Sequence, residues 1–313
     1  MNTLKPRRLR KGDCIGLVAP ASAPSNEEKI EKAVCYLESL GYRVKVGDNV
    51  RKVRGYLAGS DEERAADFNN MVRDKNVKAI FALRGGFGSP RILQKIDYRM
   101  LRQNPKIIVG YSDITALQLA VMAKSGIVTF SGPMPSVEMW NDFDKYTEEN
   151  LWRLLTSAAR VGVLKNPEEK PLRIMMEGKG RGRLLGGNCS LVTSLMGTSF
   201  LPKLQGAVLV LEDTDEAPHR IDRMFAHLLN SGVLRRLSAL LLGEFTNCVP
   251  SDPSTPNLTI NEVISDYASL LKCPVIANLQ YGHIPRKLTL PWGLQTAVDT
   301  KRGRIEVLES AVV

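Results

Sequence analysis

Short apolar, β-branched runs alternate with helical patterns from the beginning of the chain. Residues 15–18 form the first run, an amphipathic pattern extends from there to about residue 41, and a second apolar run covers 42–46. Parallel strands need a crossover connection, which is usually a helix. The alternation therefore predicts an α/β fold in which helices cover both faces of a parallel sheet.

Capping signals mark the starts of the first two helices. In a capping box, a serine and a glutamate three residues later each satisfy a free backbone N–H of the first turn. This pattern occurs at Ser25 to Glu28 and at Ser60 to Glu63. The second helix is expected to end near Asp74. Further strands are expected at 78–83, 106–109 and 127–130, with a helix at 114–124.

The periodicity fades between about residues 156 and 180, where proline, glutamate and glycine accumulate. We expect an N-terminal domain at 1–160, a linker at 161–180 and a smaller α/β C-terminal domain at 181–313. Within the C-terminal domain, strands are expected at 207–211, 239–242 and 274–277, and helices at 219–230 and 260–271. Turn residues from 288 onward predict short antiparallel strands.

Composition places the chain among ordinary globular proteins. Hydrophobic residues make up 43% of the 313 residues and charged residues 24%, which is typical of neither a disordered nor a membrane protein. The basic segment 5–11 precedes an apolar run that Gly16 and Pro20 interrupt, whereas a signal peptide needs roughly 7 to 15 apolar residues. Five scattered cysteines without a C-x-x-C pair argue against disulfides and zinc. We expect a cytoplasmic protein without a membrane segment.

The net charge of +10 raises the question of nucleic acid. The basic clusters at 5–11, 51–54, 179–183 and 301–304 are spread along the chain, with no interleaved aromatic residues and no known nucleic-acid motif. A solvated surface or an anionic small substrate explains the charge better. We therefore expect no nucleic-acid partner.

Four loops that directly follow predicted strands are rich in glycine or polar residues. Parallel sheets bind ligands beyond the carboxyl ends of their strands, so these loops are the candidate site. They are Arg84-Gly85-Gly86-Phe87-Gly88-Ser89, Gly110-Tyr111-Ser112-Asp113, Glu212-Asp213-Thr214-Asp215-Glu216 and Gly282-His283-Ile284-Pro285-Arg286.

Ser112 stands between a predicted strand and a predicted helix. In a nucleophile elbow, a sharp turn at this position exposes the hydroxyl, and a neighbouring N–H faces the developing oxyanion. The match is partial, because Ile114 occupies the place of the second glycine in G-x-S-x-G. On its own, Ser112 is better interpreted as an ordinary helix N-cap.

The loop around Gly85 and Gly86 allows three interpretations. Its N–H groups suit a phosphate, or a second oxyanion donor beside a serine, and glycines also occur in plain tight turns. Neither G-x-G-x-x-G nor the P-loop pattern is present. A non-catalytic module that binds an anion or a nucleotide stays open as an alternative of a different class.

A serine nucleophile needs a base, and the chain has only three histidines. His219 and His227 fall within a predicted amphipathic helix, whereas His283 follows a strand in a candidate loop. Glu212, at the end of an apolar strand, is placed to orient an imidazole. Its neighbour Asp213 is expected to be solvated, as are Asp215 and Glu216.

Cys189 follows Gly186-Gly187-Asn188, at the expected start of a helix. A thiol at a helix N-terminus can have a lowered pKa and act as a nucleophile. We favour a core or capping role for this residue.

Together these segments, in this order, resemble the family of L,D-carboxypeptidases and microcin C immunity peptidases along essentially the whole chain. The segments that carry the resemblance are Gly12-Asp13, Val18-Ala19-Pro20-Ala21-Ser22, Arg84-Gly85-Gly86-Phe87-Gly88, Gly110-Tyr111-Ser112-Asp113, Gly186-Gly187-Asn188, Leu211-Glu212-Asp213 and Gly282-His283.

The resemblance implies a Ser-His-Glu triad. Ser112 would be the nucleophile, His283 the general base and acid, and Glu212 the residue that orients His283. The N–H groups of Asp113 and Gly86 would form the oxyanion hole, with Gly85 in place of Gly86 if the loop register differs by one.

The family also implies a flavodoxin-like N-terminal domain that carries the serine and a C-terminal domain that carries Glu212 and His283. The site would lie between the two domains, in a homodimer, without a metal or an organic cofactor.

Within the family, microcin immunity enzymes carry an extra aromatic loop for a nucleotide-like substrate. Residues 139–143 are the one candidate here, and we expect them to be core and loop. The resemblance therefore favours murein tetrapeptide, cleaved between diaminopimelate and the terminal D-alanine in cytoplasmic recycling, with a microcin-type conjugate as the alternative. Arg84 and Arg286 are candidates for binding the substrate carboxylates.

Overall fold

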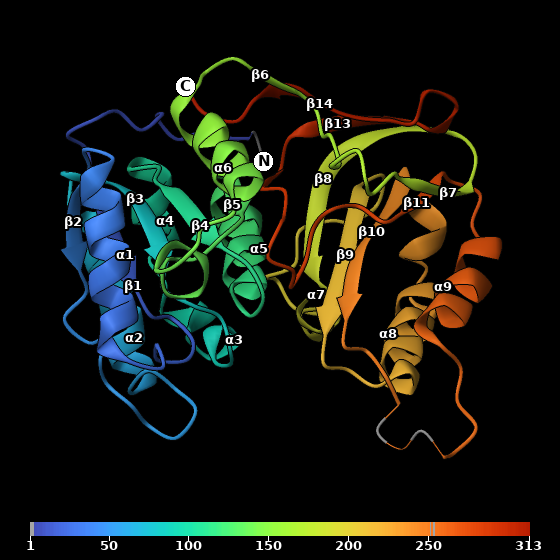
Figure 1. Cartoon of the computed structure of the whole chain (residues 1–313), viewed down its shortest axis with the longest axis horizontal. Helices are drawn as coiled ribbons and strands as arrows, with labels where there is room; N and C mark the ends of the chain where they lie inside the picture. The colour runs from blue at the N-terminus through green and yellow to red at the C-terminus, as the bar shows by residue number, and fades with distance from the viewer. Residues whose placement is uncertain (1–2, 251, 253) are drawn as a thin grey trace.

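The computed structural model describes residues 3–250, 252 and 254–313, and their strands form two sheets that lie side by side (Figure 1). One sheet has six strands and the other eight, and helices pack against both. The α/β prediction is confirmed.

The first sheet contains the parallel strands of the N-terminal half in the order β2-β1-β3-β4-β5, which is the flavodoxin-like order. These strands are β1 (Cys14–Val18), β2 (Arg43–Val46), β3 (Val77–Ala82), β4 (Ile107–Gly110) and β5 (Thr129–Ser131). Helices α1 (Glu27–Ser39) and α6 (Lys145–Thr156) pack on one face, and α2 (Asp61–Arg73) and α5 (Ile114–Ser125) on the other. The short helices α3 (Ser89–Ile92) and α4 (Tyr98–Gln103) connect β3 to β4.

One of the two predicted helix starts is confirmed, and the other is shifted by one residue. Ser60 and Glu63 form the expected capping box at α2. At α1 the predicted box at Ser25 is wrong by one residue, because Asn26 is the N-cap and its side chain accepts the Lys29 N–H at 3.1 Å. Asparagine caps a helix as well as serine does, so residue type alone does not distinguish Ser25 from Asn26.

The second sheet has the order β6-β14-β13-β8-β9-β10-β11-β7, with β8 to β11 parallel and the outer strands antiparallel. Its strands are β6 (Arg160–Val163), β7 (Arg173–Met176), β8 (Lys179–Asn188), β9 (Val208–Thr214), β10 (Ala239–Thr246), β11 (Val275–Ala277), β13 (Gln295–Asp299) and β14 (Arg304–Ser310). Its helices are α7 (Cys189–Ser194), α8 (Pro218–Asn230) and α9 (Ile260–Ser269).

The expected linker 161–180 contains regular structure, since most of β6 and all of β7 lie within it. The long strand β8 follows directly. Its glycines interrupt the alternation of apolar and polar residues, so the sequence pattern did not predict this strand. A Cβ at Gly182 would lie 1.9 Å from the carbonyl oxygen of Gly206, and one at Gly186 would lie 1.9 Å from that of Val210. Close approach of the neighbouring backbone therefore requires glycine in this strand.

One strand of the C-terminal half belongs to the first sheet. β12 (Leu290–Trp292) pairs antiparallel with β5. At the same boundary, the Asn188 N–H donates to Thr115 Oγ1 at 3.2 Å, and the hydroxyls of Ser131 and Tyr281 lie 2.6 Å apart. These buried contacts join α5 and the end of β5 to the end of β8 and the segment after β11, close to the candidate loops.

Candidate active site

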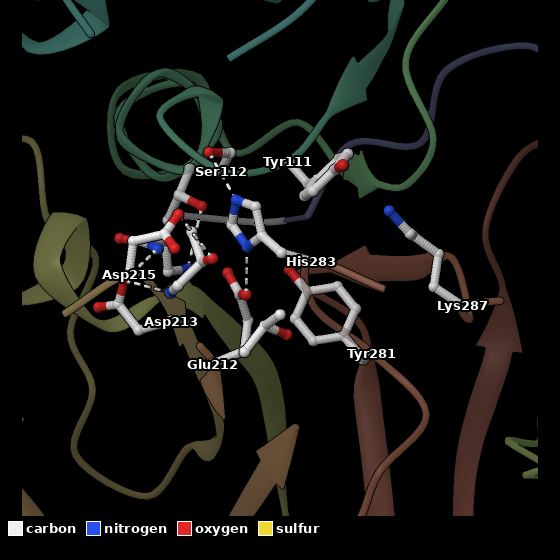
Figure 2. Close-up of polar contacts among 12 residues, drawn as sticks. Tyr111, Ser112, Glu212, Asp213, Asp215, Tyr281, His283 and Lys287 are labelled. Atoms are coloured by element: carbon white, nitrogen blue, oxygen red, sulfur yellow. Dashed lines mark hydrogen bonds and ion pairs between the residues drawn. The ribbon is translucent and has the colours of Figure 1, made fainter. Parts of the chain in front are cut away.

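Three side chains from distant parts of the chain form a hydrogen-bonded row (Figure 2). His283 Nε2 lies 2.9 Å from Ser112 Oγ, and His283 Nδ1 lies 2.7 Å from Glu212 Oε2. Ser112 follows β4 of the first sheet, while Glu212 lies in β9 and His283 follows β11 of the second. The row therefore spans the boundary between the two sheets.

The backbone at Ser112 makes a sharp turn between β4 and α5. Its φ of 63° is in the left-handed region, which is uncommon for a residue with a side chain. A Cβ at Gly110 would lie 2.8 Å from Ile114 Cγ2, so the turn also requires glycine there. Asp113, and not Ser112, is the N-cap of α5, which makes the simple capping interpretation of Ser112 wrong.

The Glu212 carboxylate is fully buried beneath the imidazole. A Cβ at Gly282, whose φ is 131°, would lie 3.1 Å from Glu212 Oε2. A carboxylate can only accept hydrogen bonds, so His283 Nδ1–H donates to it and Nε2 is left to accept from the Ser112 hydroxyl. The burial of Glu212 thus fixes both the orientation and the tautomer of the ring.

The glycine-rich loop is tied to the residue that follows Ser112. The Asp113 carboxylate accepts the Ser89 N–H at 2.8 Å, and the Ser89 hydroxyl donates to the Asp113 carbonyl at 2.5 Å. Burial raises the pKa of Asp113, although hydrogen bonds from Ser89 and Gly88 oppose the shift. Sequence reasoning assigned Asp113 only a backbone role, and nothing in its position signalled these side-chain contacts.

Two glycines of this loop have different constraints. A Cβ at Gly85 would lie 2.8 Å from Ser112 Cβ, so only glycine allows the loop to approach the serine. Gly86 has a φ of 104° and faces Ser22, whose hydroxyl accepts the Phe87 N–H at 3.1 Å. In the described part of the chain, the N–H groups of Gly85, Gly86 and Asp113 have no backbone acceptor.

A buried polar cluster lies on another side of His283 (Figure 2). The Tyr111 ring contacts the imidazole edge-on, with 5.1 Å between centroids, and its hydroxyl donates to Glu138 Oε1 at 2.8 Å. Lys287 Nζ lies 2.6 Å from the same oxygen and 3.9 Å from the centre of the Tyr111 ring. Sequence reasoning missed Glu138 and Lys287, because an isolated acidic or basic residue in a loop is usually solvated.

Two cavities are each lined by one chain neighbour of Ser112, although Ser112 itself lines neither of them. The first, which we name the Lys287 cavity, has a volume of ≈ 320 Å³. It is lined by Tyr111, Val137, Glu138, Asn141, Asp142, Asp144, His283, Ile284, Pro285 and Lys287. The second, the Leu191 cavity, has a volume of ≈ 680 Å³. It is lined by Tyr56, Gly86, Phe87, Gly88, Pro90, Arg91, Asp113, Ser190, Leu191 and Ser194.

The candidate carboxylate-binding arginines have other surroundings. Arg84 Nη1 lies 3.5 Å from the Ala23 carbonyl oxygen, and Arg286 pairs with Asp144 at 3.2 Å and with Glu169. Neither arginine is among the residues that line the two cavities. His219 and His227 are exposed on α8, away from this row.

Asp213 and Cys189 are buried beside the site. Asp213 was expected to be solvated, and this is wrong: its carboxylate accepts from Asn188 Nδ2 at 2.8 Å and from the Ser190 N–H at 2.9 Å. It therefore fixes the start of α7. Burial raises the pKa of the Cys189 thiol, consistent with the core role that we favoured.

Residues 3–250, 252 and 254–313 contain neither a candidate metal site nor a candidate membrane-spanning helix. No group of three or more His, Cys, Asp or Glu side chains in these ranges is arranged to hold a metal ion. Among the same residues, no helix combines the length and the apolar character that crossing a bilayer requires.

Comparison with known proteins shows that the chain is similar to carboxypeptidases. Residues 15–132 match the LD-carboxypeptidase N-terminal domain family and residues 181–298 the LD-carboxypeptidase C-terminal domain family. A probable murein peptide carboxypeptidase of Bacillus subtilis is 38% identical over 309 residues, which cover 98% of this chain and 95% of that protein.

Two solved structures are similar over nearly the full chain. MccF, a microcin C7 self-immunity protein, in complex with glutamyl sulfamoyl guanosine has a TM-score of 0.90 at 27% identity, covering 99% of this chain and 100% of that one. A muramoyltetrapeptide carboxypeptidase from Oxalobacter formigenes has a TM-score of 0.82 at 30% identity, covering 96% and 100%.

Proposed function

The chain belongs to the LD-carboxypeptidase family, and on that basis we propose that it removes the terminal D-alanine from murein tetrapeptide. The observation that carries the proposal is the hydrogen-bonded row of Ser112, His283 and Glu212 at the boundary of the two sheets. We assign these residues as nucleophile, general base and orienting carboxylate.

The reaction is acyl transfer in two steps. Ser112 Oγ attacks the carbonyl carbon of diaminopimelate while His283 Nε2 takes the hydroxyl proton. The same proton then passes to the nitrogen of the leaving D-alanine, the C–N bond breaks, and an ester to Ser112 remains. A water molecule, deprotonated by His283, attacks this ester. The C–O bond to Ser112 then breaks, His283 returns the proton to Ser112 Oγ, and the tripeptide is released.

The remaining groups stabilise the charges that develop. Glu212 is buried and accepts the Nδ1–H, so it stabilises the imidazolium that forms during each proton transfer. The N–H groups of Gly86 and Asp113 are the proposed oxyanion donors, with Gly85 as the alternative to Gly86. All three N–H groups lack a backbone acceptor in the described chain, which leaves each of them able to bind an oxyanion.

A murein substrate is favoured over a nucleotide conjugate by the surroundings of residues 139–143. Met139 is buried, and the Trp140 ring lies under Lys29 Nζ, which is 4.5 Å from its centroid. Phe143 packs edge-on against Tyr36, with 5.5 Å between centroids. The aromatic rings of this segment already have partners within the chain, which supports their role in packing.

We also propose that the enzyme works as a homodimer in the cytoplasm, during peptidoglycan recycling. The five cysteines are all free thiols in the structure, which fits a reducing compartment. The dimer is an expectation from the family, and sedimentation analysis of the purified protein tests it.

Mass spectrometry of the purified protein incubated with murein tetrapeptide tests the reaction directly, with Ser112→Ala as the control. Release of D-alanine by the wild type alone is expected. If the tetrapeptide survives and an aminoacyl adenylate is cleaved, the substrate class is that of the microcin enzymes. If neither is cleaved and ATP binds saturably, the non-catalytic alternative replaces the proposal.

A further inference from the structure

The two residues that flank Ser112 point to a division of the substrate. Tyr111 lines the Lys287 cavity and Asp113 lines the Leu191 cavity. His283 belongs to the Lys287 cavity, whereas Gly86 belongs to the Leu191 cavity together with Asp113. The general acid and the proposed oxyanion donors therefore border different cavities.

The proposed chemistry assigns a direction to each half of the substrate. The leaving nitrogen must lie within hydrogen-bond reach of His283 Nε2 to receive its proton. The released residue then extends into the Lys287 cavity, and the acyl chain extends to the other side of Ser112. The volumes agree with this order, because the cavity for the single released residue is ≈ 320 Å³ and the other is ≈ 680 Å³.

Lys287 is the one Lys or Arg side chain among the described residues that line its cavity. Its side chain is only 2% exposed, and its ammonium donates to Glu138 at 2.6 Å. Glu138 also accepts hydrogen bonds from the Tyr111 hydroxyl and, at 2.7 Å, from the Met134 N–H. Lys287 is therefore not the sole donor to this carboxylate among the described residues. An ammonium has three donors, which leaves Lys287 able to bind a second carboxylate.

The other carboxylates of the cavity are already engaged. Asp144 accepts from the Thr147 N–H at 2.9 Å and pairs with Arg286 at 3.2 Å, while Asp142 accepts from Asn141 Nδ2 at 3.0 Å. These contacts reduce the repulsion that an incoming anion would meet. Lys287 is the buried cation of the cavity that His283 also lines.

We propose that the Lys287 cavity receives the released residue, with Lys287 Nζ binding its free carboxylate, and that the Leu191 cavity receives the acyl chain. This inference rests on the proposed peptidase function. It makes Lys287 the residue that restricts the enzyme to the C-terminal residue of a peptide, since only there does a free carboxylate lie on the same residue as the leaving nitrogen.

The test compares a tetrapeptide that ends in a free acid with the same peptide ending in an amide. The wild type is expected to prefer the acid in kcat/KM by about 10- to 100-fold, the range of one charge-assisted hydrogen bond. Lys287→Met combined with Glu138→Gln removes both charges of the buried pair without leaving one unpaired, and is expected to abolish this preference. Lys5→Met with Glu309→Gln, which removes a partly buried pair at 3.0 Å elsewhere, is the matched control.

The outcomes separate the two proposals. A wild type that cleaves neither peptide overturns the proposed function and this inference with it. A wild type that cleaves acid and amide equally, or a folded double variant that keeps the preference, overturns only the assignment of Lys287. If the preference for the free acid is lost in Arg286→Met or Arg84→Met instead, the assignment of Lys287 is overturned as well.

The acyl half is tested by substrate length. Leu191→Trp fills part of its cavity and is expected to raise KM for the tetrapeptide at least about 10-fold, while a dipeptide of diaminopimelate and D-alanine is affected much less. Leu270→Trp, at an exposed position after α9, is the control. Equal effects of Leu191→Trp on both lengths, or a change only in the acid-over-amide ratio, would overturn the assignment of this cavity.

Discussion

Ser89 binds Asp113 twice, through its N–H to the carboxylate at 2.8 Å and through its hydroxyl to the carbonyl oxygen at 2.5 Å. Asp113 follows Ser112 directly, so these bonds couple the glycine-rich loop to the backbone of the proposed nucleophile. The two proposed oxyanion donors, from Gly86 and Asp113, are consequently held by one rigid connection between two loops.

Ser112→Ala is expected to lower kcat by about 10³-fold or more, because the acyl-enzyme ester can no longer form. The thermal unfolding midpoint should stay close to that of the wild type, since among the described residues the hydroxyl forms a hydrogen bond with His283 alone. Turnover and calorimetry on the same preparation check both statements. Unchanged turnover in a folded variant would remove Ser112 from the mechanism.

Glu212→Gln is expected to reduce kcat by about 10²- to 10⁴-fold. A glutamine amide can donate to Nδ1, which stabilises the tautomer whose Nε2 carries a proton and cannot accept from Ser112. Steady-state kinetics measure the effect, and Glu169→Gln, at an exposed site, is the control. A decrease in kcat of less than about tenfold would contradict the orienting role that we assign to Glu212.

Gly85→Ala is expected to lower kcat strongly, because the new Cβ would lie 2.8 Å from Ser112 Cβ. Gly16→Ala provides a matched control, as its Cβ would lie 2.7 Å from Met71 Sδ in the core of the first sheet. The control should lower the free energy of unfolding and leave the turnover of the folded fraction unchanged. If the two variants lose turnover equally, crowding at Ser112 is not the cause.

Asp113→Asn tests the linkage between burial and pH. The folded-state pKa of Asp113 is raised, chiefly by burial, so the folded protein binds more protons there than the unfolded chain does. Its contribution to the free energy of unfolding is present below the unfolded pKa of about 3.9 and is lost as the pH rises through the higher folded pKa. Asparagine does not titrate, so the variant loses no stability at this position as the pH rises.

The stability deficit of Asp113→Asn relative to the wild type should therefore shrink as the pH rises from acid toward neutral. Urea unfolding of both proteins across this range measures the difference, in which the other titrating groups cancel. A deficit that grows with pH would mean that the hydrogen bonds from Ser89 and Gly88 outweigh burial.

Much of the framework follows from local patterns. The alternation of apolar and amphipathic segments predicted the strands from β1 to β5 and from β9 to β11, because strand and helix periods are properties of short stretches of chain. The pattern failed at β8, where the glycines at 182 and 186 make room for neighbouring backbone and leave no apolar period. That requirement arises from strands that are distant in sequence.

By itself, the sequence determined the α/β class and placed the loops of Ser112, Glu212 and His283 at the ends of strands, since both depend on residue type and spacing. Only the tertiary structure decided which side chains meet. The pairing of β12 with β5, the bonds between Ser89 and Asp113 and the burial of Lys287 against Glu138 all join segments whose separation in space no local period encodes. The bonds between Ser89 and Asp113 join two loops of the first sheet, and the other two contacts join the two halves of the chain. All three form only when these elements pack, and burial then decides which charges must pair.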